Sequence, residues 1–283
     1  MCRAIWLVIF IGWCLTGTGF ALEAVRFAPL PMENRETVVK QFRPMTDYLQ
    51  QRLGISIEYV YADSYADILE KFRNGDIDLA YLGPLPYVEL RASYPQAEPL
   101  IHFKEASGQT TYTCALVAFS DSEYPLNDLT DKTVALTQPL STCGYLSANG
   151  LLRRHGSSLE HNRYRYLGKH DAVALAVVQG QFKVGGLKTA IGKKYAHLGL
   201  SILDETDPLP SFALTANKTT LKPELVNQIR HALISIDPDG KHREMLAGWG
   251  DNIRYGAVPA DDANYDVIRG LLVGVDIPKE GNF

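Results

Sequence analysis

Hydrophobic and polar positions along the chain form blocks whose period changes repeatedly between that of a strand and that of a helix. Apolar or β-branched runs at 24–30, 56–62 and 77–83 predict three buried strands. The blocks between them have helical spacing, one over 33–54 and one after Ser64, whose hydroxyl would cap the helix start. Because this βαβαβ order builds one sheet with helices on both faces, it predicts a mostly parallel sheet.

A second alternating pattern begins at residue 111. Strand-like runs lie at 112–119, 134–138, 163–167 and 182–186, and helical runs lie at about 141–155 and 170–178. The later strand-like run 212–217 and the helical runs beyond residue 222 have no sheet of their own. We therefore expect them to return to the first sheet.

These blocks predict an α/β protein of two lobes. The first lobe comprises 22–110 plus 212–283, the second comprises 111–211, and two chain crossings join them. Lobes joined in this way can close on a ligand about a hinge. Since ligands of open parallel sheets bind at the carboxyl ends of the strands, we expect the site in the cleft between the lobes.

The N-terminal residues have the pattern of an export signal. One positive charge at Arg3 precedes an apolar run over 4–15 and small residues that end at Ala21. The apolar run is shorter than the roughly 20 residues that a membrane-spanning helix needs. We expect cleavage of a signal peptide, 1–21, and a soluble protein in the periplasm.

Composition and charge exclude several classes. The formal net charge is −4 and no lysine-rich or arginine-rich run is present, which argues against nucleic-acid binding. After signal cleavage Cys114 and Cys143 remain, and a lone cysteine pair in an oxidising compartment suggests one disulfide. No cysteine or histidine pair has zinc spacing, so we expect no metal and no cofactor.

The segment QPLSTCGY, 138–145, holds the clearest candidate chemistry. Ser141 and Thr142 follow a predicted strand and open a predicted helix, where free backbone N–H groups and the positive end of the helix dipole favour an anion. The alternative is an ordinary N-cap. The position at a strand end favours the anion site.

Three further positions lie where the same cleft is expected. His170 opens the next predicted helix and can donate to a phosphate-like group, although a capping or surface histidine is the alternative. In the first lobe, Tyr65 follows the second strand. The loop after the third strand adds Gly83, Pro84 and Tyr87. Tyrosine offers a hydroxyl donor on a rigid apolar body, but with 15 tyrosines in the chain packing is the alternative for each.

A thiol nucleophile is the enzymatic alternative. Cys143 at a helix start would have a lowered pKa, and His170 could act as its base in a thiol-dependent hydrolase. The sequence offers no third group to orient the histidine, and Cys114 competes for Cys143 in an oxidising compartment. We therefore expect a binding protein rather than an enzyme.

Five segments together resemble one known family. They are FRPMTDYLQQRLG, DSYADILEKFRNGDIDLAYLGPLPYVE, LNDLTDKTVALTQPLSTCGYL, GKHDAVALAVVQGQ and KKYAHLGLSILDETDPLP, and the similarity extends over nearly the whole chain after the signal. In their order and spacing the chain resembles the periplasmic substrate-binding proteins for phosphate, phosphite and phosphonate uptake. The resemblance implies the two-lobed type II periplasmic binding protein fold.

The resemblance also implies roles for single residues. Members of this family hold phosphonate oxygens with a Ser-Thr-Ser run, a histidine at the next helix start and two tyrosines. The matching positions here are Ser141, Thr142, Cys143, His170, Tyr65 and Tyr112. All keep the family's residue type except the third serine, which is replaced by Cys143.

Departures from the family pattern affect the other end of the ligand. Relatives that bind aminophosphonates hold the amine with a glutamate and an aspartate, whose positions match Ala190 and Phe212. Neither residue accepts a hydrogen bond from an ammonium, and a buried ammonium without a carboxylate is costly. Lys188 could favour a second anionic group, or it could be a solvated helix lysine. The resemblance thus implies a ligand without an amine, with Phe212 lining its pocket.

The same comparison gives both cysteines a role. Cys114 lies two residues after Tyr112, so on a strand the two side chains share a face, and Cys143 lies in the anion-binding segment. We predict a Cys114–Cys143 disulfide that fixes this segment to the strand that carries Tyr112.

With the resemblance, the residues predict a periplasmic solute-binding protein. It would capture a small phosphonate-like oxyanion, namely phosphate, phosphite or an alkylphosphonate, and deliver it as a monomer to an inner-membrane ABC permease. The alternative partner is a membrane signalling protein, which similar exported proteins serve as ligand sensors.

Overall fold

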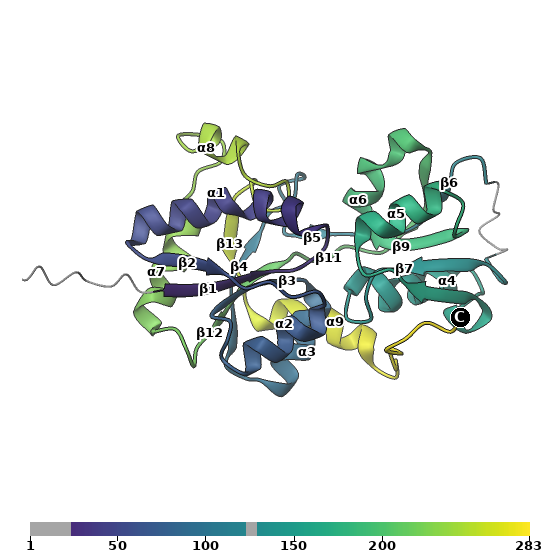
Figure 1. Ribbon diagram of the computed structural model, residues 1–283, viewed down its shortest axis with the longest axis horizontal. Coiled ribbons are helices and arrows are strands. Elements are labelled where there is room, and N and C mark those ends of the chain that lie inside the picture. The colour runs from purple at the N-terminus through teal and green to yellow at the C-terminus, as the bar shows by residue number, and fades with distance from the viewer. Residues whose placement is uncertain (1–23, 123–128) are drawn as a thin grey trace, which may run out of the picture.

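The computed structural model describes residues 24–122 and 129–283. The predicted signal peptide, 1–21, lies outside these residues. Two α/β lobes lie side by side and are joined by the antiparallel strands β5 (Thr111–Tyr112) and β11 (Leu209–Pro210), as Figure 1 shows. No helix within the described ranges is long and apolar enough to cross a membrane.

The first lobe holds most of the N-terminal and C-terminal parts of the chain. Its elements are β1 (Ala24–Pro29), α1 (Arg35–Leu53), β2 (Ser56–Tyr59), α2 (Tyr65–Arg73), β3 (Leu79–Leu82), α3 (Pro84–Ser93), β4 (Ala97–Phe103), β12 (Ala213–Asn217), α7 (Pro223–Ile234), α8 (Arg243–Ala247), β13 (Ala257–Pro259), a 3-10 turn (Asp262–Tyr265) and α9 (Asp266–Leu272). The sheet order is β13-β4-β12-β3-β1-β2. The β1 strand is parallel to β2 and β3, whereas β12 is antiparallel to β3 and β4. The sheet is therefore mixed: β4 runs in the same direction as β1, β2 and β3, whereas β12 and β13 run the other way.

Local signals in the sequence set the helix ends of this lobe. The Asn34 side chain accepts from the Thr37 N–H at the start of α1, and the Ser64 side chain accepts from Asp67 at the start of α2. The helix α1 ends at Gly54, whose φ of 66° is the left-handed conformation that glycine adopts without strain. These caps fix where the following strands and loops begin.

The second lobe is a mixed five-stranded sheet. Its elements are β6 (Cys114–Phe119), β7 (Thr133–Leu136), a π turn (Thr142–Leu146), α4 (Ser147–Arg154), a 3-10 turn (Leu159–His161), β8 (Arg163–Tyr166), α5 (His170–Val178), β9 (Val184–Lys188), α6 (Thr189–Lys194), a second 3-10 turn (Ala196–Leu198) and β10 (Leu200–Glu205). The order is β10-β6-β9-β7-β8, with β7 parallel to β8 and β9. Both β10 and β9 are antiparallel to β6.

The helix expected from residue 141 begins differently. The segment Thr142–Leu146 forms a π turn that is interrupted at Gly144, whose ψ of −124° is not helical, and the regular helix starts only at Ser147. A Cβ at Gly144 would lie 2.6 Å from the Gln138 carbonyl oxygen. This close approach of two backbone segments is what glycine permits here.

The C-terminal segment connects the lobes a further time. After α9, which packs on α3 of the first lobe, the chain crosses to the second lobe (Figure 1) and there binds β8, an edge strand of that sheet. The Asn282 N–H donates to the Tyr164 carbonyl at 3.1 Å, and the Tyr166 hydroxyl donates to the Pro278 carbonyl at 2.8 Å. Sequence patterning grouped this segment with the first lobe, but its hydrogen bonds lie on the second.

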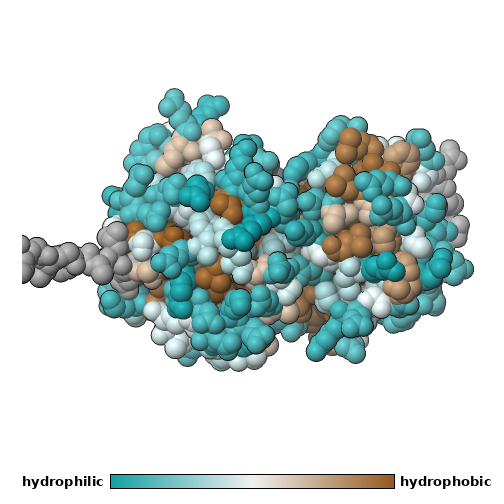
Figure 2. Space-filling view, viewed as in Figure 1, coloured by the Kyte–Doolittle hydropathy of each residue, from teal (hydrophilic) through white to brown (hydrophobic). Residues whose placement is uncertain are grey.

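The apolar cores follow the sheet faces. In the first lobe α1 and α7 contact each other on one face and α2, α3 and α9 gather on the other. The second lobe has separate cores beneath α5 with α6 and beneath α4. Figure 2 shows apolar residues on the visible face over α5 and α6 and a largely hydrophilic surface elsewhere.

Candidate functional site

The Ser141 and Thr142 side chains lie buried at the junction of the two lobes. They are 3% and 4% exposed. The hydroxyl of Tyr65, from the first lobe, faces the Ser141 side chain, and the hydroxyl of Tyr112, on the crossing strand β5, faces Thr142. Four hydroxyl-bearing residues from three separate parts of the sequence therefore meet at one place.

Neither buried tyrosine hydroxyl at this junction completes a hydrogen bond of normal geometry among the described residues. Burial is the main cause that raises the pKa of Tyr65 and of Tyr112 well above the usual value, so both phenols stay protonated, although Ser141 lies near enough to lower the pKa of Tyr65 slightly and Thr142 does the same for Tyr112. An unpaired buried hydroxyl costs about 1–3 kcal/mol, and native proteins keep few of them. Other buried hydroxyls among the described residues are also unpaired, namely those of Thr137, Ser147, Ser211 and Thr215. The two phenols are distinguished because each faces a further hydroxyl, that of Ser141 or that of Thr142.

The backbone near Ser141 is less open than a regular helix start would be. The Ser141 N–H donates to the Gln138 carbonyl at 3.0 Å, and the Gly144 N–H donates to the Ser141 carbonyl at 2.9 Å. The expectation of a free Ser141 N–H is therefore wrong, because a tight turn over 138–141, just before the π turn, gives it the Gln138 carbonyl as its partner. Thr142 Oγ1 accepts from the Leu85 N–H at 3.0 Å, which leaves its own proton available to donate.

His170 is 2% exposed and neutral. Its Nδ1 accepts from the Lys188 N–H at 3.1 Å, so the ring proton of the neutral imidazole is assigned to Nε2. Burial, and then the positive charge of Lys188, lower the pKa of His170 to about 3. Its neighbourhood is tied to the Ser141 segment, since the Gly168 N–H donates to the Thr137 carbonyl and the Gln138 side chain donates to Gly168. His170 is thus a neutral donor, not a cation.

The lobes are held in a closed arrangement by contacts around these residues. The Tyr65 N–H donates to Gln138 Oε1 at 2.9 Å, and the His170 N–H donates to the Met32 carbonyl at 3.0 Å. The ammonium of Lys194 binds the buried carboxylate of Glu33 at 2.6 Å. Together with the Leu85–Thr142 bond, these contacts join the first lobe to several segments of the second, including the start of α5 and the end of α6.

Of the remaining predicted site residues, Gly83, Pro84 and Phe212 lie close together, whereas Tyr87 lies apart from the buried hydroxyls. Gly83 lies against Phe212, since a Cβ at Gly83 would be 3.0 Å from that ring. Pro84 opens α3 and is buried beside it. Tyr87 does not join the hydroxyls: it is fully buried, its hydroxyl donates to Asp262 at 2.6 Å and its ring packs on Tyr265.

Lys188 fits neither alternative drawn from the sequence. It ends β9 rather than lying on a helix, and it is 1% exposed. Its Nζ donates to both carboxylate oxygens of Glu105, at 2.8 and 3.0 Å, and to Asn252 Oδ1 at 3.2 Å. The rings of Tyr112 and Phe212 lie 5.2 and 5.1 Å from Nζ. All three ammonium hydrogens are therefore used within the protein.

Sequence reasoning missed Glu105, Asn252, Gln138 and Thr137. Glu105 lies in the crossing after β4, and its partner Lys188 is 83 positions away in the chain. Nothing periodic marks such a pair. Thr137 and Gln138 directly precede the Ser141 segment at the end of β7, and this strand-end position was a usable signal for both.

The predicted disulfide is confirmed. Cys114 and Cys143 are bonded, with their Cα atoms 5.0 Å apart and 29 positions between them in numbering. The bond joins β6, just after Tyr112, to the π turn that carries Thr142. A hydrolase with a free Cys143 thiolate does not match this arrangement, because the sulfur is already engaged.

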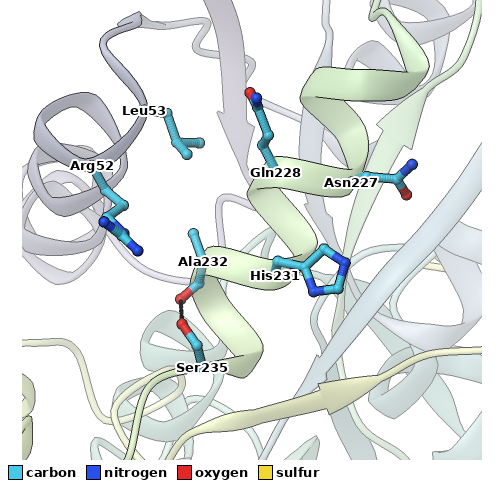
Figure 3. A pocket seen from close by; sticks show the side chains of 7 residues that line it. All are labelled: Arg52, Leu53, Asn227, Gln228, His231, Ala232 and Ser235. Atoms are coloured by element: carbon cyan, nitrogen blue, oxygen red, sulfur yellow. Dashed lines mark hydrogen bonds between the residues drawn. The ribbon is translucent and has the colours of Figure 1, made fainter.

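Two further kinds of site can be compared with the junction. Among the described residues no cluster of three or more histidine, cysteine, aspartate or glutamate side chains could hold a metal. A surface groove of about 470 Å³ lies between α1 and α7; Figure 3 shows its lining residues, namely Arg52, Leu53, Asn227, Gln228, His231, Ala232 and Ser235. All of them belong to the first lobe, and none meets the buried hydroxyls at the junction.

A cavity of about 370 Å³ does reach the junction. It lies beside the crossing strands, and its lining includes Glu105, Tyr112, Lys188 and Ala190. Of the four hydroxyl-bearing residues only Tyr112 lines this cavity, together with the Lys188–Glu105 ion pair.

Comparison with known proteins agrees with this geometry. The family model described as "ABC transporter, phosphonate, periplasmic substrate-binding protein" matches residues 27–265. The Phosphate-import protein PhnD of Mycolicibacterium smegmatis is 27% identical over 278 residues, which are 90% of this chain and 86% of that protein. The Probable ABC transporter phosphite binding protein PhnD1 of Prochlorococcus marinus is 23% identical over 181 residues, 60% of this chain and 59% of that protein.

A solved structure shows the same fold. PhnD1 from Prochlorococcus marinus in complex with methylphosphonate superposes with a TM-score of 0.78 at 18% identity, over 89% of this chain and 98% of that one. The likeness confirms the predicted two-lobed architecture. Since the family model matches most of the sequence, the chain belongs to the periplasmic substrate-binding proteins of ABC transporters for phosphonate and related ligands.

Proposed function

We propose that this protein binds a small phosphonate-like oxyanion between its lobes, with Tyr65, Tyr112, Ser141, Thr142 and His170, here called the anion cluster. The observation that carries the proposal is the pair of buried, unpartnered hydroxyls of Tyr65 and Tyr112 that face Ser141 and Thr142. Each can donate to an oxygen placed between them.

The cluster suits an oxyanion because its side chains are neutral donors. The two phenols stay protonated and His170 is neutral with its proton on Nε2. Thr142 uses its oxygen as an acceptor for Leu85 and keeps a proton to give. In a site of low dielectric, fixed hydrogen-bond donors stabilise an anion without the desolvation cost of a cation.

The ligand within this class is phosphate, phosphite or an alkylphosphonate rather than an aminophosphonate. Phosphate and phosphite occur in the names of the relatives, and methylphosphonate occupies the similar solved structure. Ala190 and Phe212 offer no acceptor to an amine. Glu105 is a carboxylate in the same region, but Lys188 already engages both of its oxygens.

Delivery to a transporter completes the proposal. The protein is exported by a cleaved signal peptide over 1–21 and works as a monomer without cofactor or catalysis. Its lobes are 22–110 with 212–272, and 111–211 with the C-terminal segment after α9 bound to it. They close on the anion about the β5–β11 crossing and present it to an inner-membrane ABC permease. The family's role as the binding component of such transporters supports this step.

Calorimetric titration of ligand-stripped protein tests the proposal. We expect saturable binding of at least one of phosphate, phosphite and methylphosphonate, with sulfate as the comparison anion. Tyr112→Phe removes one unpartnered donor and should weaken that binding about tenfold or more. The control Tyr166→Phe removes a hydroxyl that donates to Pro278, away from the cluster, and should leave affinity unchanged. Absence of binding by all three anions would refute the proposed ligand class.

A further inference from the structure

The surroundings of the Lys188 ammonium have the form of a cation-binding site. Two carboxylate oxygens of Glu105 and one amide oxygen of Asn252 accept its three hydrogens. The aromatic rings of Tyr112 and Phe212 both lie within about 6 Å, the range of a cation–π interaction. We call Glu105, Asn252, Tyr112 and Phe212 the ammonium cage.

The cage and its occupant come from different parts of the fold. Glu105 lies on the crossing after β4 and Asn252 follows α8 of the first lobe, whereas Lys188 is the last residue of β9 in the second lobe. The side chain of Lys188 therefore enters a cage that other elements build. A side chain that is 1% exposed and fully hydrogen-bonded leaves no hydrogen for a ligand.

The cage adjoins the anion cluster. Tyr112 belongs to both, with its ring beside Lys188 Nζ and its hydroxyl facing Thr142. The backbone N–H of Lys188 binds Nδ1 of His170 at 3.1 Å. An anion held by the cluster would thus have the cage as its neighbour on the crossing-strand side.

We propose that Lys188 is a specificity-determining residue: its ammonium fills a cage that would otherwise accept the cationic end of an aminoalkyl anion. The proposal rests on the proposed anion site. A ligand ammonium entering beside Lys188 would meet a like charge and find Glu105 already paired, so it would be desolvated without compensation. An anion whose other end is uncharged, such as the methyl group of methylphosphonate, meets no such conflict.

The first arm of the test compares two ligands, methylphosphonate and 2-aminoethylphosphonate, by calorimetry. The wild-type protein should bind methylphosphonate about tenfold or more tightly than the aminoethyl compound. Lys188→Ala empties the cage and leaves Glu105 in place, so it should shift the ratio of the two affinities about tenfold toward the aminoethyl compound. The control Lys188→Met removes the charge but keeps the cage filled with an apolar chain, and should not produce this gain.

The second arm does not depend on the anion site. Methylammonium should raise the melting temperature of Lys188→Ala, because it can bind Glu105 and the two rings. It should leave wild-type protein and the double variant Lys188→Ala/Glu105→Gln unchanged, since the first has no room and the second has no carboxylate.

The outcomes separate the two proposals. If no anion binds but methylammonium stabilises Lys188→Ala, the proposed function fails and the cage stands. If the wild-type protein binds methylphosphonate and 2-aminoethylphosphonate equally, the specificity role of Lys188 is overturned. This comparison uses only the wild-type protein, so it does not depend on whether a variant folds. Equal behaviour of Lys188→Ala and Lys188→Met in both assays overturns it as well.

Discussion

The anion cluster and the ammonium cage lie side by side, share Tyr112 and are buried to a similar degree, yet their polar groups are in opposite states. In the cluster, the hydroxyls of Tyr65 and Tyr112 have no partner among the described residues. In the cage, every hydrogen of the Lys188 ammonium has an acceptor. Two neutral hydroxyls of the cluster therefore lack hydrogen-bond partners, whereas the charged ammonium of the cage has a partner for each hydrogen.

The difference separates two uses of buried polarity. An unpaired buried hydroxyl lowers the free energy of unfolding and is retained where a ligand can supply the partner. A buried charge without partners is far more costly, so it persists only when the protein itself completes its bonds. In the proposed function, the unpaired hydroxyls of Tyr65 and Tyr112 would bind the anion, and the completed ion pair of Lys188 would exclude a cationic ligand group.

The largest expected effect concerns the disulfide, which ties the turn of the anion cluster to the strand that follows Tyr112. Replacing both Cys114 and Cys143 by alanine should lower the free energy of unfolding by about 3–4 kcal/mol, because the unfolded chain loses a constraint across 29 positions. Urea denaturation of the double variant measures the loss. An unchanged midpoint, with or without dithiothreitol on the wild-type protein, would contradict the role of the bond.

The next effect concerns the charged side of the comparison. Glu105→Ala should lower the free energy of unfolding by about 3 kcal/mol, because it leaves the Lys188 ammonium buried without a counter-charge. The matched control is Glu160→Ala, which breaks an exposed pair with Arg153 at 3.7 Å and should cost less than about 1 kcal/mol. If urea melts showed equal losses in the free energy of unfolding for the two variants, the buried ion pair would contribute no more to stability than the exposed one.

A smaller effect with opposite signs concerns the neutral side. Tyr65→Phe deletes an unpartnered hydroxyl, so the ligand-free protein should be as stable as the wild type or more stable by up to about 1 kcal/mol, while anion affinity falls about tenfold or more. Tyr87→Phe deletes a hydroxyl that donates to Asp262 and should cost about 1–2 kcal/mol with affinity unchanged. Denaturation and calorimetry on both variants check the crossed pattern; a destabilised Tyr65→Phe would show that its hydroxyl has a structural partner.

The smallest effect is a dependence on pH. The folded protein holds the pKa of His170 at about 3, below the value near 6.5 of an unfolded chain, so the unfolded state binds the proton first as pH falls. His170 should therefore reduce the free energy of unfolding of ligand-free protein by about 0.7 kcal/mol between pH 7 and pH 6.

His170→Gln isolates this contribution, because His102, the other histidine whose pKa burial lowers, stays in both proteins. Urea melts at pH 7 and pH 6 give the free energy of unfolding of each protein. Its decrease between the two pH values should be larger for the wild type than for His170→Gln by about 0.7 kcal/mol. Identical slopes would mean that His170 has the same pKa in the folded and the unfolded state, which would contradict its burial as a neutral group.

Much of the fold followed from local patterns. The strands at β1, β2 and β3 and the starts of α2 and α5 lie close to where the periodicity and the caps placed them. The π turn did not follow, because the approach of Gly144 to Gln138 is a contact that a helical pattern does not encode. The strands β4 and β10 were missed, and each is placed by its pairing with distant strands.

The site divides in the same way. The Ser-Thr run and His170 were readable from the sequence because each directly follows a strand-like run and opens a helical pattern. The family resemblance added Tyr112 and the cysteine pairing. Glu105 and Asn252 carried no signal, since their common partner Lys188 lies 83 and 64 positions away.

The sequence by itself determined the alternation of strands and helices, the hydroxyls and histidine at helix starts, and the pair of cysteines. Periodicity, capping and residue type depend on only a few neighbouring positions, so they can be recognised in the sequence alone. Only the tertiary structure decided which hydroxyls are left unpaired and that the Lys188 ammonium is enclosed by Glu105, Asn252 and two rings. Burial and hydrogen-bond completion depend on segments that meet only when both lobes and their crossings are folded.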